Sequence, residues 1–299
     1  MASSSKKSPT AAKSLRAKPP ASRANRVTAP LSYLSRCREA LATADGHEID
    51  VWELRVPSGS EHLSDWAARF RRRYCTEEEL DVLRNGTNKS RAEYLTETVF
   101  PDEHAPPGPG IRAADFSELL ISDYLEFLRG YWVPREKYAE KASRNESPKG
   151  IDVLGFRVSR IGAFAPTDEL FLFEVKAQLS GRKYSGAVQK AVDDSSKDYL
   201  KQAVTLHAVK RRLLRAGEQQ KMLLVQRFQN PSDHPYVLRS GAAALLSDSA
   251  YDKGQIRKST KVAGHKNASN LEVLVIRGTD LMRLVNALYQ KAADDAGSE

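Results

Sequence analysis

The spacing of hydrophobic and polar positions predicts helices in the first third of the chain. After a short alternating strand pattern at 48–56, apolar residues recur at helical intervals behind capping residues. The predicted helices begin near Ser64, Thr76 and Ser90. A stretch rich in Pro and Gly at 104–110 then interrupts the pattern. We therefore predict a mostly helical segment over 31–110, followed by a separate domain over 111–299.

The second part of the chain mixes helical periodicity with strand patterns. The predicted elements are a helix at 116–129 with Asp115 as N-cap, strands at 151–158 and 169–177, a long helix at 186–216, a helix at 219–229, a strand at 271–276 and a closing helix at 280–292. Helices that alternate with strands in this way predict an α/β fold, in which a mixed sheet is flanked by helices.

The positive charge of the chain is concentrated at its N-terminus. The formal net charge is +9, but residues 1–30 hold seven basic residues and no acid, so the rest of the chain carries 40 basic and 38 acidic residues. Because residues 1–30 contain almost no large apolar side chains, we expect a disordered basic tail, which either contacts nucleic-acid phosphates or serves as a solubility arm.

Membrane insertion and disulfide bonding are not indicated. The longest apolar runs, such as 170–173, are far shorter than a membrane span. Cys37 and Cys75 form no CxxC pair, so the sequence predicts neither a disulfide framework nor a structural zinc site. We expect a cytoplasmic protein with no membrane partner.

Two predicted strands carry acidic side chains on faces that are otherwise apolar. Alternation along 169–177 places Glu174 and Lys176 on one face together with leucines, and Asp152 shares its face with apolar residues of the preceding strand. A carboxylate on a buried strand face costs roughly several kcal/mol unless it is paired or bound to a cation. If the strands are neighbours, two carboxylates and an ammonium converge, and a divalent cation would relieve the repulsion between the carboxylates.

Glu118, on the preceding helix, completes the residue order of PD-(D/E)xK nucleases: an acid-bearing helix, an acid at the start of one strand, and Glu-x-Lys at the end of the next. Asp152, Glu174 and Glu118 are therefore the predicted ligands of Mg²⁺, or of Mn²⁺, and Lys176 is predicted to act on the attacking water. A structural interpretation stays open: Glu174 and Lys176 can form an ion pair, Asp152 can cap a turn, and Glu118 can complete a capping box with Asp115.

Several stretches also carry a resemblance to a known family. They are 114–120 (ADFSELL), 130–135 (GYWVPR), 150–156 (GIDVLGF), 173–177 (FEVKA) and 194–198 (DSSKD). Together they resemble HamA, the nuclease component of the Hachiman anti-phage defence system. The resemblance implies a prokaryotic two-component system in which a superfamily 2 helicase subunit, HamB-like, restrains the nuclease until infection. It gives Glu118, Asp152, Glu174 and Lys176 the nuclease positions, with Ile151 in place of the proline of the motif's name.

The combined prediction is a restriction-endonuclease-like core at 111–299 that hydrolyses DNA with a bound metal ion under the control of a partner helicase. The nearly neutral chain beyond the tail predicts that a partner supplies part of the affinity for DNA. Two alternatives remain: a non-catalytic binding or regulatory subunit with the same fold, and an RNA-directed toxin nuclease. The complete set of acids and lysine disfavours the first, whereas the second would use the same chemistry.

Overall fold

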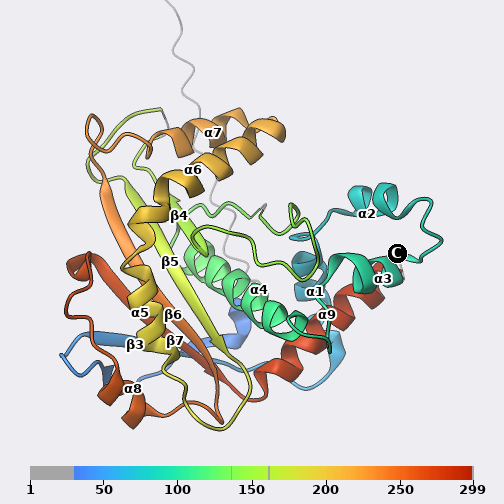
Figure 1. Cartoon of the computed structure of the whole chain (residues 1–299), viewed down its shortest axis with the longest axis horizontal. Coiled ribbons are helices and arrows are strands. Elements are labelled where there is room, and N and C mark those ends of the chain that lie inside the picture. Colours follow the sequence, from blue (N-terminus) through green and yellow to red (C-terminus); the bar gives the residue numbers. More distant parts are fainter. Residues whose placement is uncertain (1–29, 136, 161, 298–299) are drawn as a thin grey trace, which may run out of the picture.

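A computed structural model describes residues 30–297 of the chain, except residues 136 and 161. Residues 1–29, which hold nearly all of the predicted disordered tail, lie outside this part. Within the described residues, seven strands form one mixed sheet in the order β1-β3-β7-β6-β5-β4, with β2 paired to β3 (Figure 1). The strands are β1 (Leu34–Arg36), β2 (Leu41–Ala42), β3 (Glu48–Leu54), β4 (Val153–Arg157), β5 (Glu169–Gln178), β6 (Val237–Ser247) and β7 (Leu271–Gly278).

The four central strands run parallel, and antiparallel strands close the sheet on both sides. β3, β7, β6 and β5 are successive parallel neighbours, while β4 is antiparallel to β5 and β1 is antiparallel to β3. The two predicted strands at 151–158 and 169–177 are therefore neighbours, with Val153 opposite Phe173. The predicted mixed sheet flanked by helices is confirmed.

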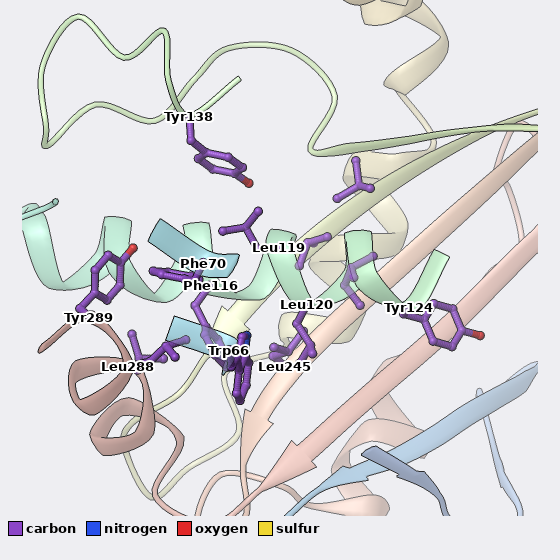
Figure 2. Packing of buried hydrophobic residues seen from close by; sticks show 14 of the residues in the cluster. Trp66, Phe70, Phe116, Leu119, Leu120, Tyr124, Tyr138, Leu245, Leu288 and Tyr289 are labelled. Carbon is purple, nitrogen blue, oxygen red and sulfur yellow. The ribbon is translucent and has the colours of Figure 1, made fainter. Parts of the chain in front are cut away.

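Helices cover both faces of the sheet. The α-helices of the described residues are α1 (Ser64–Arg71), α2 (Glu77–Arg84), α3 (Arg91–Tyr94), α4 (Gly108–Asp123), α5 (Ala187–Ser195), α6 (Asp198–Arg215), α7 (Gln219–Gln226), α8 (Lys253–Ser259) and α9 (Leu281–Gly297). α1, α4 and α9 share one apolar core with one face, and α5 and α6 pack on the other face (Figure 1). Figure 2 shows Leu245 of β6 on one side of α4 and Tyr138 on the other.

Residues 31–110 contribute strands as well as the predicted helices. β3 lies inside the sheet because it pairs with β7, and α1 packs against α9. The same core cluster contains Trp66 from α1, Phe116 from α4 and Tyr289 from α9. Both predicted segments therefore share one sheet and one core.

Two predicted helices have different bounds. α4 begins at Gly108, seven residues before Asp115, because Pro109 is tolerated in the first turn of a helix. The predicted N-cap role of Asp115 is therefore wrong: this residue is 1% exposed in the middle of the helix. The predicted long helix at 186–216 is divided into α5 and α6. At the junction the backbone tightens, since the Lys197 amide donates to the Asp194 carbonyl three residues earlier, and the Ser195 and Ser196 hydroxyls bond to His265 and to the Lys266 amide.

β6 is the main element that the hydrophobic pattern does not predict. Its sequence contains Gly241 and a run of alanines, which have low β-propensity, yet the strand lies between β5 and β7. The small residues are needed for packing, since a Cβ on Gly241 would lie 2.3 Å from the Phe173 ring. Among the described helices, none is both long and apolar enough to cross a membrane.

Candidate active site

The four predicted site residues come from α4 and from the facing ends of β4 and β5. The β4–β5 ladder ends at the pair Val153 and Phe173, so Asp152 follows beside Glu174. The Val175 amide donates to Asp152 Oδ2 at 2.8 Å, which fixes the carboxylate against β5. The antiparallel register thus brings the acid of one strand to the Glu-x-Lys sequence of the next, as predicted.

Glu174 and Lys176 lie on the face of β5 that is covered by α5 and α6. Glu174 is 5% exposed, and Lys176 Nζ donates to its Oε1 at 2.5 Å. Lys176 also pairs with Asp194 Oδ2 of α5 at 2.9 Å. Burial alone would lower the pKa of Lys176, but the hydrogen bonds to the two carboxylates outweigh it and raise the pKa above its ordinary value. In this arrangement Lys176 is a fixed positive charge.

Glu118 faces the site from α4 and does not take part in a capping box, because the helix starts ten residues earlier. The Tyr138 hydroxyl donates to Glu118 Oε2 at 2.7 Å. Lys137 forms an ion pair with the same carboxylate and donates to the Asp152 carbonyl at 2.6 Å. The loop that carries Lys137 and Tyr138 therefore connects Glu118 to Asp152.

Asp152 is the electrostatic centre of the group. Burial raises the pKa of its carboxyl well above the ordinary value, and the charges of Glu118 and Glu174 raise it further. The Lys137 ammonium and the Val175 amide offset only part of this effect. The Asp152 carboxylate is therefore close enough to those of Glu118 and Glu174 to be repelled by both. A divalent cation bound between them would relieve this repulsion.

The donor chemistry of this group fits a hard divalent cation, since the carboxylates supply only oxygen ligands. One observation supports the fit: Glu174 Oε2 is buried, accepts no hydrogen bond within the described residues, and faces a cation already, the Lys201 ammonium at 3.5 Å. In the same part of the chain, however, no three Asp, Glu, His or Cys side chains are already close enough together to hold one ion. Lysine ammonium groups neutralise the acids instead, so cation binding would require the side chains to rearrange.

Sequence reasoning missed several residues that complete this environment. Lys137 falls in a segment with no periodic pattern, and no sequence signal places it beside Glu118. Asp194 of α5 pairs with Lys176, and Asp198 and Lys201 of α6 lie beside Glu174. The stretch at 194–198 belongs to the resemblance described above, which was the available signal for the two aspartates.

Comparison with known families gives one match. A family model described as HamA matches residues 32–292, which is most of the chain. No curated protein matches the chain significantly.

Proposed function

Because the chain belongs to the HamA family, we propose that it is a divalent-metal-dependent phosphodiesterase that cleaves DNA under the control of a partner helicase. Membership of this family implies a role in Hachiman anti-phage defence. The observation that carries the enzymatic proposal is the position of Asp152, whose carboxyl interacts with both Glu118 and Glu174 while Lys176 lies on the same strand as Glu174.

The four site residues would have two roles, metal binding and stabilisation of charge on the phosphate. Asp152, Glu174 and Glu118 would hold Mg²⁺ or Mn²⁺, which when bound supplies a Lewis acid for the phosphate and lowers the pKa of a water molecule. Lys176 is held protonated by its two carboxylate partners. It would therefore stabilise the negative charge that develops on the phosphate and orient the water, rather than remove a proton from it.

The partner helicase would supply part of the DNA binding. Phosphate neutralisation dominates the affinity of proteins for DNA, and beyond residue 30 the chain has a surplus of only two basic residues. Many basic side chains of the described residues are also engaged: Arg135 binds Asp123 and Glu126, and Arg227 binds Asp168. A nuclease with so little free positive charge needs another source of phosphate contacts.

The test is cleavage of supercoiled plasmid, linear duplex and single-stranded RNA with Mg²⁺ or Mn²⁺. The chain is assayed alone and with the helicase encoded beside it. We expect metal-dependent cutting of DNA that requires or increases with the helicase, and a loss of about 100-fold or more in Lys176→Ala. Asp152→Asn should show a similar loss.

Lys258→Ala is the matched control, since Lys258 is an exposed lysine at the end of α8. It should cut like the wild type. If RNA is cut and DNA is not, the same chemistry acts on a different substrate, and the DNA assignment is wrong. If a folded complex forms and no nucleic acid is cut under any condition, the chain is a non-catalytic subunit.

A further inference from the structure

A pocket of about 460 Å³ lies between α7 and the connection from β4 to β5. This connection begins after Arg157, at one end of the ladder between the two strands, whereas Asp152 and Glu174 lie at the other end (Figure 1). Small-molecule sites in proteins typically measure about 300–1,000 Å³, so the pocket can hold a ligand of moderate size. It is separate from the candidate active site.

Arg227 joins the three segments that line the pocket. Its guanidinium donates to the Asp168 carboxylate at 2.7 Å and to the Ala165 carbonyl at 2.8 Å, both in the β4–β5 connection. It also donates to the His234 carbonyl at 2.9 Å, in the segment that leads into β6. Arg227 itself follows α7 and is 5% exposed. Because one buried guanidinium holds the walls together, a ligand would find the pocket already formed.

An exposed aromatic ring forms part of the pocket wall. Phe164 stacks on the His234 imidazole, with the ring centroids 3.8 Å apart and the ring planes 2° from parallel. Phe164 is nevertheless 60% exposed, and Leu223 of α7, which also lines the pocket, is 53% exposed. Nucleobases of any kind stack on aromatic side chains, since every base has a flat π face. A planar ligand group therefore fits beside Phe164.

The charge of the pocket is positive. Among the described residues that line it, Arg160 and Lys210 are basic and none is acidic. Asp168 balances the charge of Arg227, but the Lys210 ammonium donates to the neutral side-chain oxygen of Gln229 at 3.1 Å, which leaves its charge uncompensated. Arginine and lysine are the side chains that proteins use to bind phosphate groups. An anionic ligand is therefore favoured.

Side-chain amides supply the other polar groups of the pocket. They belong to Gln220, Gln226, Gln229 and Asn230. Each amide has two N–H donors and one carbonyl acceptor, the combination that pairs with the edge of a nucleobase. An anionic lipid would match the charge but would leave these amides without partners. A flat face, a hydrogen-bonding edge and a phosphate occur together in a nucleotide.

We propose that this pocket binds one nucleotide, with its base on Phe164 and its phosphate at Arg160 and Lys210. The nucleotide is either free or an unpaired nucleotide of a nucleic-acid strand, since both present the same chemistry. This inference goes beyond the metal-dependent cleavage proposed above and does not rest on it, because the pocket contains no residue of the candidate active site. The bound nucleotide would contact the connection between the strands that lead to Asp152 and Glu174.

The test measures binding to the full-length chain in the absence of divalent cations, so that cleavage plays no part. Isothermal titration calorimetry is used for the nucleoside monophosphates, and fluorescence anisotropy for a labelled single-stranded oligonucleotide of mixed sequence. The wild type should bind at least one of these two probes saturably. If a monophosphate binds, its nucleoside should bind at least tenfold more weakly, because it lacks the phosphate. A nucleoside that binds equally well would overturn the proposal.

Variants of the wall residues locate the binding. Phe164→Ala should weaken binding at least tenfold, whereas Phe164→Trp should retain it, because an indole ring also stacks on a base. The double variant Arg160→Glu with Lys210→Glu should weaken binding at least tenfold and remove most of its salt dependence. Leu83→Ala of α2 and Lys258→Ala of α8 are the matched controls, since both change exposed side chains outside the pocket. Circular dichroism melts check that each variant is folded.

The two probes distinguish the sources of the nucleotide. Binding of the monophosphates alone indicates a free nucleotide, and binding of the oligonucleotide alone, weakened in Phe164→Ala, indicates a strand. Strand contacts with other surfaces are common to all variants and do not affect this comparison. If neither probe binds at millimolar concentration, or if Phe164→Ala and the double variant bind like the wild type, the pocket is not a nucleotide site. Metal-dependent cleavage is measured separately, so this failure leaves the proposed function standing.

Discussion

The turn between β4 and β5 is held by a buried ion pair whose removal should destabilise the protein strongly. Asp168 is fully buried and Arg227 is 5% exposed. Arg227 Nε donates to Asp168 Oδ2 at 2.7 Å, and the Ser159 and Ala165 amides donate to the same carboxylate at 2.8 and 3.1 Å. This cluster fixes the connection between the strands that carry Asp152 and Glu174.

The expected magnitude follows from the burial of the pair. Removing one partner of a buried ion pair leaves the other charge without compensation and costs about 3–5 kcal/mol. In Asp168→Ala, Arg227 keeps its bonds to the Ala165, His234 and Pro235 carbonyls. These carbonyl groups still stabilise the buried guanidinium when the carboxylate is removed. We therefore expect the free energy of unfolding to fall by about 3 kcal/mol, near the lower end of that range.

The assay is urea unfolding at pH 7.5, followed by tryptophan fluorescence. Asp233→Ala is the control, because Asp233 is an exposed acid whose carboxylate accepts a hydrogen bond from the nearby Asn230 side chain, and a change within about 0.5 kcal/mol is expected. The double variant Asp168→Leu with Arg227→Met should not recover the lost stability, because the apolar pair leaves the Ser159 and Ala165 amides and the Ala165, His234 and Pro235 carbonyls without these partners.

The pH dependence provides a second check on the same pair. Burial would raise the pKa of Asp168, but the Ser159 amide and the Arg227 guanidinium outweigh it and hold the pKa below its ordinary value. The stabilisation is therefore present above a pH of about 4 and is lost as the pH falls through the lowered pKa. A loss below 1 kcal/mol in Asp168→Ala at pH 7.5, or a difference from the wild type that does not shrink in acid, would refute the reasoning.

Three further predictions concern the core that supports the site. Gly241→Ala would place a Cβ 2.3 Å from the Phe173 ring, so urea unfolding should show a loss of about 1–3 kcal/mol, and an unchanged stability would mean that β6 shifts freely. Tyr289→Phe removes a hydroxyl that lies 2.5 Å from the Tyr74 hydroxyl, and the same assay should show a loss of about 1 kcal/mol. Burial raises the pKa of Asp115 to about 6, so the free energy of unfolding should fall by up to about 3 kcal/mol as the pH rises from about 4 to 6. Thermal unfolding at several pH values measures this change. Asp115→Asn should remove this part of the pH dependence, and an unchanged pH dependence in the variant would contradict the prediction.

Capping patterns in the sequence predicted helix starts correctly where the helix start depends only on neighbouring residues. The helix start predicted near Thr76 is confirmed, and Thr76 forms a capping box with Glu79 through both reciprocal hydrogen bonds. The similar pattern at Asp115 and Glu118 was misleading, because α4 begins upstream in the Pro-rich and Gly-rich stretch that was expected to interrupt the chain. A capping pattern shows that a helix can begin at a residue, but it does not show that no helix precedes it.

Contacts between distant parts of the chain could be predicted only where the alternation of side chains along a strand indicated them. The alternation in β4 and β5 was enough to bring Asp152 beside Glu174. β6 was not predictable, since its small residues make sense only once Phe173 is known to pack against Gly241. Lys137 and Lys201 were missed for the same reason: their positions depend on the path of a loop and on the break between α5 and α6.

Lysine ammonium groups neutralise the acids that are buried together at the candidate site. Lys137 neutralises Glu118 from a loop, Lys176 neutralises Glu174 from its own strand, and Lys201 approaches Glu174 from α6. Because the ammonium groups and the proposed metal ion would use the same carboxylate oxygens, the affinity for that ion would depend on how firmly the loop and α6 hold their lysines. If the proposed metal ion binds, the loop of Lys137 and α6 would therefore control its affinity, and the strand pattern does not reveal either lysine.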